Sequence, residues 1–314
     1  MRRLMTSTLL ALTLLVPGSA MAEFPGDNKI TFVIPYNPGG GFDTIVRTYA
    51  PALEKALGTT VVPENIAGGS GTRGGQAVYR ADPDGYTIGI FNIPGLTISE
   101  VTDRDIGFKL SEITWIANLA ESKYAIAVKG DSPIQSVQDL CNLGRPIKLS
   151  DTGPDSTSSI TSVIAFNIIG CEITNITGYG GSNDTMIAVM RGDVDATLKP
   201  ISSLAKYTKS GDLRVIVTLT TEPVLDGVPT VKDLGYPQIA KFTVNRVVGG
   251  PPGMPADVAA KLAEGFRAAT ESETVQSWAA GTSTELNFMD AASTKAMMDD
   301  LSNFYLQYKD LLKK

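Results

Sequence analysis

ITFVIPYNPGGGFD occupies residues 30–43. The segment 29–35 is rich in β-branched residues and predicts a strand, which the run from Asn37 to Gly41 ends. From Phe42 onward, apolar residues recur with helical spacing until Gly58, and we expect Pro51 to kink or restart this helix. The segment therefore predicts a strand, a glycine-rich loop and a helix.

The same alternation continues outward from this unit. Residues 59–63 and 87–92 predict strands, and 75–81 predict a helix between them, so the first third is a βαβαβ unit. Further strands are expected at 123–129, 146–150, 172–177, 194–198 and 213–219, and further helices at 156–170, 185–192, 255–269, 273–281 and 291–312. This order predicts an α/β fold with mostly parallel sheets flanked by helices, in two lobes joined by crossovers near 121–124 and 217–221.

Composition excludes several classes of function. The chain has 314 residues, 27 basic and 33 acidic, and a net charge of -6, without the basic excess of a nucleic-acid binder. It contains no histidine, which rules out a Ser-His-Asp triad, a Cys-His pair and histidine-ligated zinc. We expect no cofactor and no bound metal.

The first 22 residues are typical of a signal peptide. Arg2 and Arg3 precede an apolar run from Leu9 to Val16, and Ala20-Met21-Ala22 forms an A-x-A cleavage site. The run is too short for a membrane anchor, and no cysteine follows the site to carry a lipid. We expect cleavage after Ala22 and export to the periplasm; the alternative is a core helix with a chance A-x-A.

Export would place the two cysteines of the chain in an oxidising compartment. Cys141 and Cys171 are the only cysteines of the chain, and an oxidising compartment would allow them to pair. We predict a disulfide; two buried free thiols are the alternative, because spacing says nothing about geometry.

Two loops between a strand and a helix are candidate anion sites. The glycines at 39–41 can direct backbone N–H groups to one point at the positive end of a helix. The hydroxyl-rich run 150–159 also precedes a helix and could hold a carboxylate by hydrogen bonds. The alternatives are an ordinary tight turn and redundant helix capping.

A third cluster carries a literal G-x-G-x-x-G from Gly69 to Gly74. The acidic residue that a dinucleotide site needs about 20 residues further on is absent, since that region holds Ile90, Phe91 and Asn92. We therefore expect no dinucleotide, and the lack of a Gly-Lys-Ser/Thr sequence excludes a P-loop.

Taken together, the short motifs resemble one family along nearly the whole chain: the tripartite tricarboxylate transporter solute receptors, or Bug receptors. The matching motifs are Ile34-Pro35, Pro38-Gly39-Gly40 with Asp43 and Arg47, Leu57-Gly58, Glu64-Asn65, Asp82-Pro83-Asp84-Gly85-Tyr86-Thr87, Thr152-Gly153-Pro154, Tyr179 with Gly181, Gly192-Asp193-Val194-Asp195, Gly211 with Leu213-Arg214, Val228-Pro229-Thr230 and Pro251-Pro252-Gly253-Met254-Pro255.

The resemblance implies a type II periplasmic binding protein clamshell. Residues 23–122 and 222–314 would form the first lobe and 123–221 the second, with a small carboxylate held between them. The ligand-binding residues carried over are Gly40, Gly41, Phe42, Asn92, Thr152, Ser156, Thr157, Tyr179, Gly180, Gly181 and Ser182. From these uncharged groups we expect that N–H dipoles and hydroxyls, rather than a cation, hold the carboxylate.

The chain departs from the family pattern at several positions. Ser159 stands where members often have histidine, and Asp155 adds a negative charge where glycine is usual. Lys199 is expected either to contact the ligand's far end or to be a solvated surface residue. Arg246 is expected to contact the ligand or to form an interlobe or structural ion pair.

The function predicted from these motifs is that of a periplasmic receptor. It would deliver a small carboxylate to the membrane subunits of a tripartite transporter, and we expect a monomer. A ligand receptor for a signalling system is the alternative. An enzyme is a third possibility, for which the cleft loops show no catalytic constellation.

Overall fold

The computed structural model describes residues 24–154, 156–282 and 284–312, so the predicted signal peptide and Asp155 lie outside the described residues. The strands are β1 Ile30–Ile34, β2 Val61–Asn65, β3 Thr87–Ile93, β4 Thr114–Lys129, β5 Ile147–Ser150, β6 Ile173–Ile176, β7 Ala196–Pro200, β8 Leu213–Thr218, β9 Thr243–Gly250 and β10 Glu285–Met289. The α-helices are α1 Gly41–Leu57, α2 Thr72–Tyr79, α3 Gly95–Val101, α4 Val137–Cys141, α5 Thr157–Ile169, α6 Ser182–Arg191, α7 Ile201–Ser210, α8 Ala256–Thr270, α9 Glu273–Thr282, α10 Ala291–Leu306 and α11 Lys309–Leu312.

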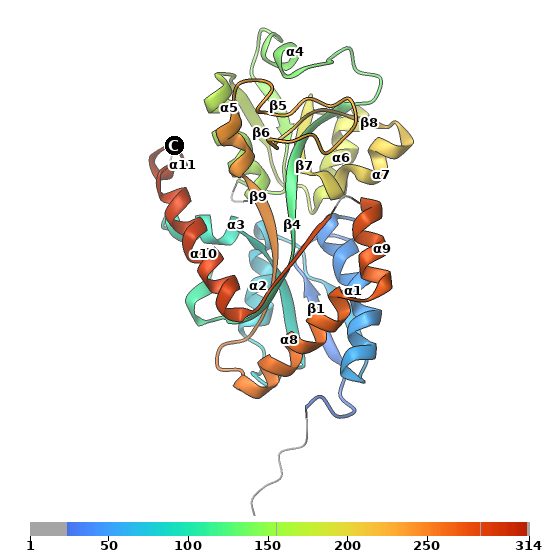
Figure 1. Cartoon of the computed structure of the whole chain (residues 1–314). Coiled ribbons are helices and arrows are strands. Elements are labelled where there is room, and N and C mark those ends of the chain that lie inside the picture. Colours follow the sequence, from blue (N-terminus) through green and yellow to red (C-terminus); the bar gives the residue numbers. More distant parts are fainter. Residues whose placement is uncertain (1–23, 155, 283, 313–314) are drawn as a thin grey trace, which may run out of the picture.

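The strands form one curled sheet in the order β2-β1-β3-β9-β4-β7-β5-β6, with β8 and β10 also paired to β4 (Figure 1). Its two βαβ parts are parallel as predicted: β1 with β2 and β3, and β5 with β6 and β7. The prediction of mostly parallel sheets is wrong for the rest, because β9 pairs antiparallel with β3 and β4, and β4 pairs antiparallel with β7, β8 and β10. The sheet is mixed because β4 and β9, which lie in the middle of the strand order, run antiparallel to each other and to their other neighbours.

Strand β4 belongs to both halves of the sheet. Its residues up to Lys123 pair with β9, and from Tyr124 onward it pairs with β7. We use "lower sheet" for β1, β2, β3, β9, β10 and the first part of β4, and "upper sheet" for β5 to β8 with the rest of β4, as oriented in Figure 1. The change of partner falls within the predicted crossover at 121–124. After β8 the chain returns from the upper sheet to the lower one. Val231 N donates a hydrogen bond to Thr218 O of β8 at 3.0 Å, and β9 of the lower sheet begins at Thr243.

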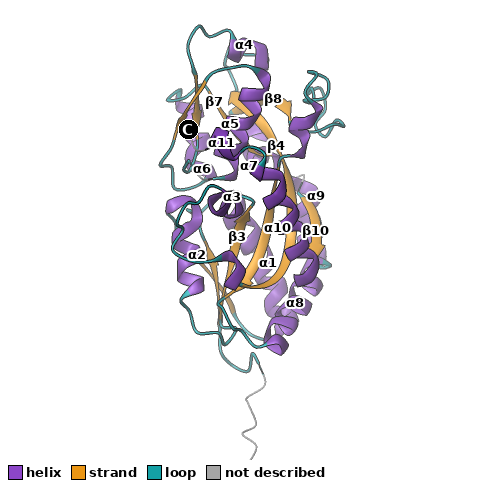
Figure 2. Cartoon of the chain, turned by 90° about the vertical axis from the view of Figure 1, so that its left-hand side faces the viewer, coloured by secondary structure: helices purple, strands orange, loops and turns teal. Residues whose placement is uncertain are grey.

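Each half of the sheet is covered by helices on both faces (Figure 2). Alternation along β1 explains this for the lower sheet: Phe32 and Ile34 join the core with α1 and α8, while Val33 joins the opposite core with α2 and α10. In the upper sheet, α6 and α7 cover one face and α5 the other. We retain the two lobes, 23–122 with 222–314 and 123–221, as a proposal.

Local differences from the sequence predictions have simple causes. Helix α1 runs without interruption through Pro51, which is exposed, so water can satisfy the carbonyl that loses its helical donor. Strand β9 was not predicted, because all of its eight residues are buried and alternation is lost. None of the helices in the described ranges is long and apolar enough to cross a membrane.

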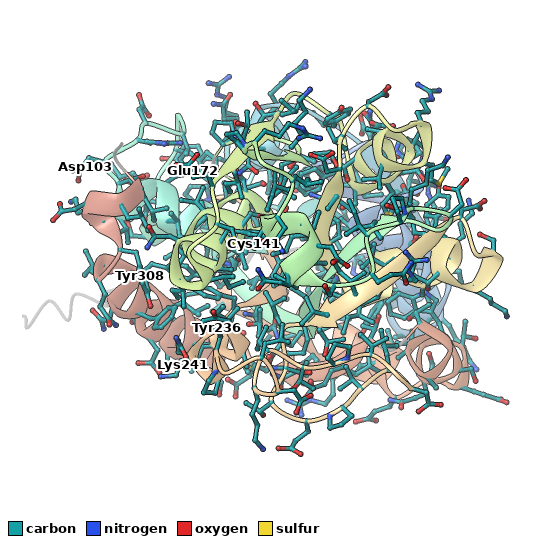
Figure 3. The ribbon with its side chains drawn as sticks, turned by 90° about the horizontal axis from the view of Figure 1, so that it is seen from above. Asp103, Cys141, Glu172, Tyr236, Lys241 and Tyr308 are labelled. Carbon is teal, nitrogen blue, oxygen red and sulfur yellow. A yellow bond between two sulfur atoms is a disulfide. The ribbon has the colours of Figure 1, made fainter. Side chains whose placement is uncertain are left out.

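The disulfide prediction is confirmed. Cys141, the last residue of α4, is bonded to Cys171, just after α5, with the Cα atoms 5.4 Å apart. Figure 3 looks down on this end of the upper half, where Cys141 lies near the centre. The bridge ties α4 to the end of α5.

Candidate ligand-binding site

The predicted ligand residues come from the carboxyl ends of strands in both halves of the sheet. The loop after β1 leads to Gly40 and α1, and Asn92 lies near the end of β3. From the upper sheet, Thr152 follows β5 and Lys199 is near the end of β7. Ligands of open α/β sheets bind at such strand ends, so the seam between the two halves is the candidate site.

A small cavity of about 20 Å³ lies at this seam. It is lined by Tyr36, Phe42, Asn92, Tyr124, Thr152, Ser158, Ser182, Lys199, Pro200 and Val244. A space of this size holds about one water molecule. In this form the cavity is therefore too small for a carboxylate of several carbons.

The hydroxyl-rich loop before α5 surrounds a carboxylate of the protein itself. Asp151 Oδ1 accepts hydrogen bonds from the hydroxyls of Ser156 at 2.5 Å and Ser158 at 2.8 Å, and from Lys199 Nζ at 3.1 Å. Asp151 and Lys199 have side chains only 1% exposed. The alternative of Lys199 as a solvated surface residue is therefore wrong: parallel β5 and β7 bring the two charges together in the interior.

The Asp151–Lys199 pair also bears on the enzyme alternative. Lys199 Nζ lies 3.0 Å from Ser158 Oγ, the contact that a Ser-Lys nucleophile would need. Burial lowers the pKa of Lys199, but the charge of Asp151 opposes that shift. Because the Ser158 hydroxyl also donates to Asp151, its proton is not directed at the lysine. The arrangement is that of an ion pair, not of an activated nucleophile.

Direct hydrogen bonds join the two halves around the cavity. Thr157 Oγ1, on α5, donates to Asn92 Oδ1 at 2.7 Å, and Asn92 Nδ2 donates to the Tyr36 hydroxyl at 2.8 Å. On the other side, Asn37 donates from its backbone N to Gly180 O at 3.1 Å and from Nδ2 to Asp184 Oδ2 at 3.0 Å. These contacts describe a closed arrangement.

Arg246 is a buried cation without an acidic partner among the described residues. Its side chain is 1% exposed; Nη1 donates to Ser122 Oγ at 2.7 Å and Nη2 to Ser202 Oγ at 3.2 Å, while Nε has no partner in the described part. Burial lowers the pKa of Arg246 to about 10, so the group stays charged at neutral pH. The ion-pair alternative is not seen among these residues, and the guanidinium holds a charge that no described acid nearby neutralises.

The position of Arg246 on β9 places it next to the cavity. Val244 lines the cavity, and residues two apart on a strand face the same side, so Arg246 lies on that face. Its guanidinium carbon is 5.5 Å from the centre of the Phe42 ring, which also lines the cavity. Arg246 therefore lies directly behind the cavity wall.

The structure places some of the predicted ligand residues at the cavity. Those lining the cavity are Phe42, Asn92, Thr152, Ser182 and Lys199. Ser156 caps α5 and donates to Asp151, as the helix-capping alternative foresaw. Gly40 and Gly41 begin α1 beside the seam, but Tyr179 packs against the apolar cluster under α6 and does not line the cavity.

The sequence analysis gave no role to Asp151, Tyr36, Tyr124 and Val244, and included Ser158 only as part of the hydroxyl-rich run 150–159. For Asp151 a signal existed, since it and Lys199 both end strands that a βαβ unit makes parallel neighbours. For Tyr124 and Val244 none existed, because both read as ordinary strand residues.

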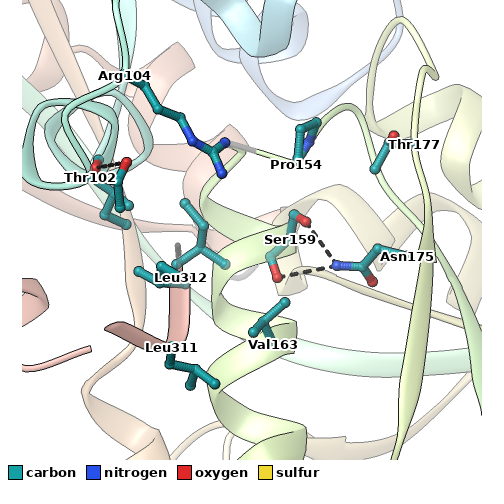
Figure 4. Close-up of a pocket in the computed structure, with 11 residues that line it drawn as sticks. Thr102, Arg104, Pro154, Ser159, Val163, Asn175, Thr177, Leu311 and Leu312 are labelled. Carbon is teal, nitrogen blue, oxygen red and sulfur yellow. Dashed lines mark hydrogen bonds between the residues drawn. The ribbon is translucent and has the colours of Figure 1, made fainter. Parts of the chain in front are cut away.

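A larger pocket of about 290 Å³ lies on another side of the α5 start (Figure 4). Its wall is mainly apolar and includes Ile160, Val163 and Leu311. Asn175 Nδ2 donates to Ser159 Oγ there at 2.8 Å. None of the predicted ligand residues lines it.

The chain is similar to known proteins along most of its length. A family model described as the tripartite tricarboxylate transporter family receptor matches residues 45–308. A UPF0065 protein of Bordetella bronchiseptica is 28% identical over 261 residues, covering 81% of this chain and 76% of that protein. A UPF0065 protein of Cupriavidus necator from the gbd 5' region is 27% identical, covering 82% and 79%.

Solved structures share the fold. The periplasmic binding protein BugD aligns with a TM-score of 0.85 at 22% identity, covering 90% of this chain and 97% of that one. MatC from Rhodopseudomonas palustris, solved with bound malate, gives 0.84 at 20% identity, covering 92% and 100%. An R. palustris protein solved with adipate gives 0.82 at 21%, covering 92% and 98%. The predicted periplasmic binding protein architecture is confirmed.

Proposed function

Because the chain belongs to the tripartite tricarboxylate transporter receptor family, we propose that it captures a small carboxylate between its two lobes and delivers it to the membrane subunits of a tripartite transporter. On this proposal the protein is exported after cleavage at Ala22, works in the periplasm as a monomer, and catalyses no reaction. Relatives of the same fold solved with malate and adipate support a carboxylate ligand.

The observation that carries the proposal is the guanidinium of Arg246, which lies behind the cavity wall and has no acidic partner among the described residues. A buried charge without a partner is costly, and a carboxylate that accepts from it removes that cost. The start of α1 at Gly40 and Gly41 adds N–H donors at the positive end of a 17-residue helix. The proposed role of Arg246 differs from the sequence-based expectation that uncharged groups alone hold the carboxylate. One of those groups, the Ser156 hydroxyl, donates to Asp151 instead.

The contacts at the seam support closure of the lobes on the ligand. The cavity is too small for a carboxylate of several carbons, so binding requires an open form that closes on the ligand. The bonds from Thr157 to Asn92 and from Asn37 to Gly180 would then re-form over it.

A thermal-shift screen of the mature protein tests the proposal. The panel contains mono-, di- and tricarboxylates, aromatic acids and amino acids. A ligand present at 100 times its dissociation constant stabilises the folded protein by about 2.7 kcal/mol, which is a clear rise in Tm. We expect at least one carboxylate to do so, and Arg246→Gln to lose that response. If no carboxylate of the panel shifts Tm, the receptor function is wrong for this ligand class.

A further inference from the structure

We infer that the ligand is a monocarboxylate with an apolar body, rather than a di- or tricarboxylate. The inference rests on the proposed function and deepens it. It depends on the sum of the buried charges around the cavity and on the apolar residues that line it.

Three charged side chains are buried in or behind the cavity wall among the described residues: Lys199 lines the cavity, Asp151 accepts from the lining residue Ser158, and Arg246 lies against the lining residue Phe42. Asp151 and Lys199 form a pair, at 3.1 Å, whose charges cancel. Arg246 contributes a single positive charge that no described carboxylate neutralises. The buried charge is therefore +1, and one carboxylate brings it to zero.

The remaining ionisable groups near the cavity do not change this sum. Burial raises the pKa values of Tyr36 and Tyr124, so both phenols stay neutral. Asp43, at the start of α1, is paired with Arg47 at 2.9 Å. Asp184 at the rim is partly exposed, where solvent weakens its charge.

A second carboxylate would meet no unpaired cation in the described wall, because Lys199, which lines it, is already paired with Asp151. It would have to leave water for a wall of which half is aromatic or aliphatic: Tyr36, Phe42, Tyr124, Pro200 and Val244. Burying an ionised group against such residues without a partner is strongly unfavourable, whereas an apolar chain or ring gains from burial there.

The test compares two acids of equal length. Hexanoate and adipate both have six carbons, and adipate differs by its second carboxylate. We expect titration calorimetry on the mature protein to give an affinity at least tenfold higher for hexanoate. Hexanamide, which lacks the charge, is expected not to bind. If adipate binds as tightly as hexanoate or more tightly, the monocarboxylate inference is wrong while the receptor function stands. If neither these acids nor any carboxylate of the wider panel binds, the proposed function itself fails.

A charge change in the protein gives a second, independent readout. Asp151→Asn keeps the shape of the side chain but raises the buried charge from +1 to +2. We expect the ratio of hexanoate to adipate affinity to move at least tenfold toward adipate. The double variant Asp151→Asn/Lys199→Met restores +1 and is expected to restore the wild-type ratio. An unchanged ratio in a folded Asp151→Asn protein contradicts the charge argument; if that variant does not fold, the wild-type ratio alone decides.

Discussion

Thr157 Oγ1 on α5 donates a hydrogen bond to Asn92 Oδ1 on β3 at 2.7 Å, which joins the two halves of the protein directly at the cavity. Both side chains are buried. Asn92 passes the connection on to the hydroxyl of Tyr36, which donates to Ser70 O at 3.0 Å. Of these bonds, the one from Thr157 to Asn92 crosses between the halves, so it is the one that a separation of the halves would break.

Removing the Thr157 hydroxyl should therefore weaken ligand binding without changing the fold. Thr157→Val keeps the side-chain shape and leaves Asn92 Oδ1 without its donor in the closed form. An unpaired buried acceptor costs about 1–3 kcal/mol, so we expect roughly a tenfold or greater loss of affinity by calorimetry. Thr48→Val is the control, because that hydroxyl bonds only within α1, to Thr44 O. Equal affinities of the two variants would contradict a closing role for this bond.

Gly180 is a second position where closure can be tested. A Cβ atom there would lie 1.9 Å from Nδ2 and 2.6 Å from Cγ of Asn37, so that amide must move and give up its bond to Asp184. We expect Gly180→Ala to remove this bond between the halves and so weaken binding, with little loss of Tm in the absence of ligand. Gly281→Ala is the matched control, since nothing lies within 4 Å of its Cβ among the described residues. Wild-type affinity in Gly180→Ala would mean that this approach is not needed for binding.

The buried Asp151–Lys199 pair makes a prediction about stability. Lys199→Met leaves Asp151 charged and unpaired in the interior, which typically costs about 3–5 kcal/mol. The double variant Asp151→Asn/Lys199→Met removes both charges and should recover much of that loss. Urea unfolding of the three proteins measures the difference. A single variant as stable as wild type would show that the pair is not held away from water.

The Cys141–Cys171 bridge closes a loop of 30 residues. In the chain-entropy model such a loop stabilises the folded state by roughly 3–4 kcal/mol. We expect thiol titration of denatured, unreduced protein to find almost no free thiol, and reduction to lower Tm. A Cys141→Ala/Cys171→Ala protein should melt at the temperature of the reduced wild type. Two free thiols in exported material would disprove the bridge.

Much of this architecture could be predicted because local signals agree with the fold. Residues 30–43 alternate, break at glycines and start a helix, and the structure has β1 and α1 there. Strand β9 escaped prediction because burial on both faces removes its alternation, and the antiparallel pairing of β4 depends on contacts distant in sequence.

The candidate site was predictable where it lies on loops and not where it lies on strands. Glycines and hydroxyls mark Gly40 and Ser156 in the sequence, and both lie at the seam. The hydrogen-bond partners of these side chains could not be predicted from the sequence. The Ser156 hydroxyl donates to Asp151, and Arg246 contacts no acidic side chain among the described residues. Charge pairing between separate strands depends on their register, which one sequence does not state.

On the proposed function, the two lobes close on a carboxylate. Small-angle X-ray scattering of the mature protein, with and without the carboxylate that raises Tm most in the thermal-shift screen, measures this closure. We expect a smaller radius of gyration at saturation for wild type and a weaker compaction for Thr157→Val at the same ligand concentration. An unchanged radius at saturating ligand would contradict closure.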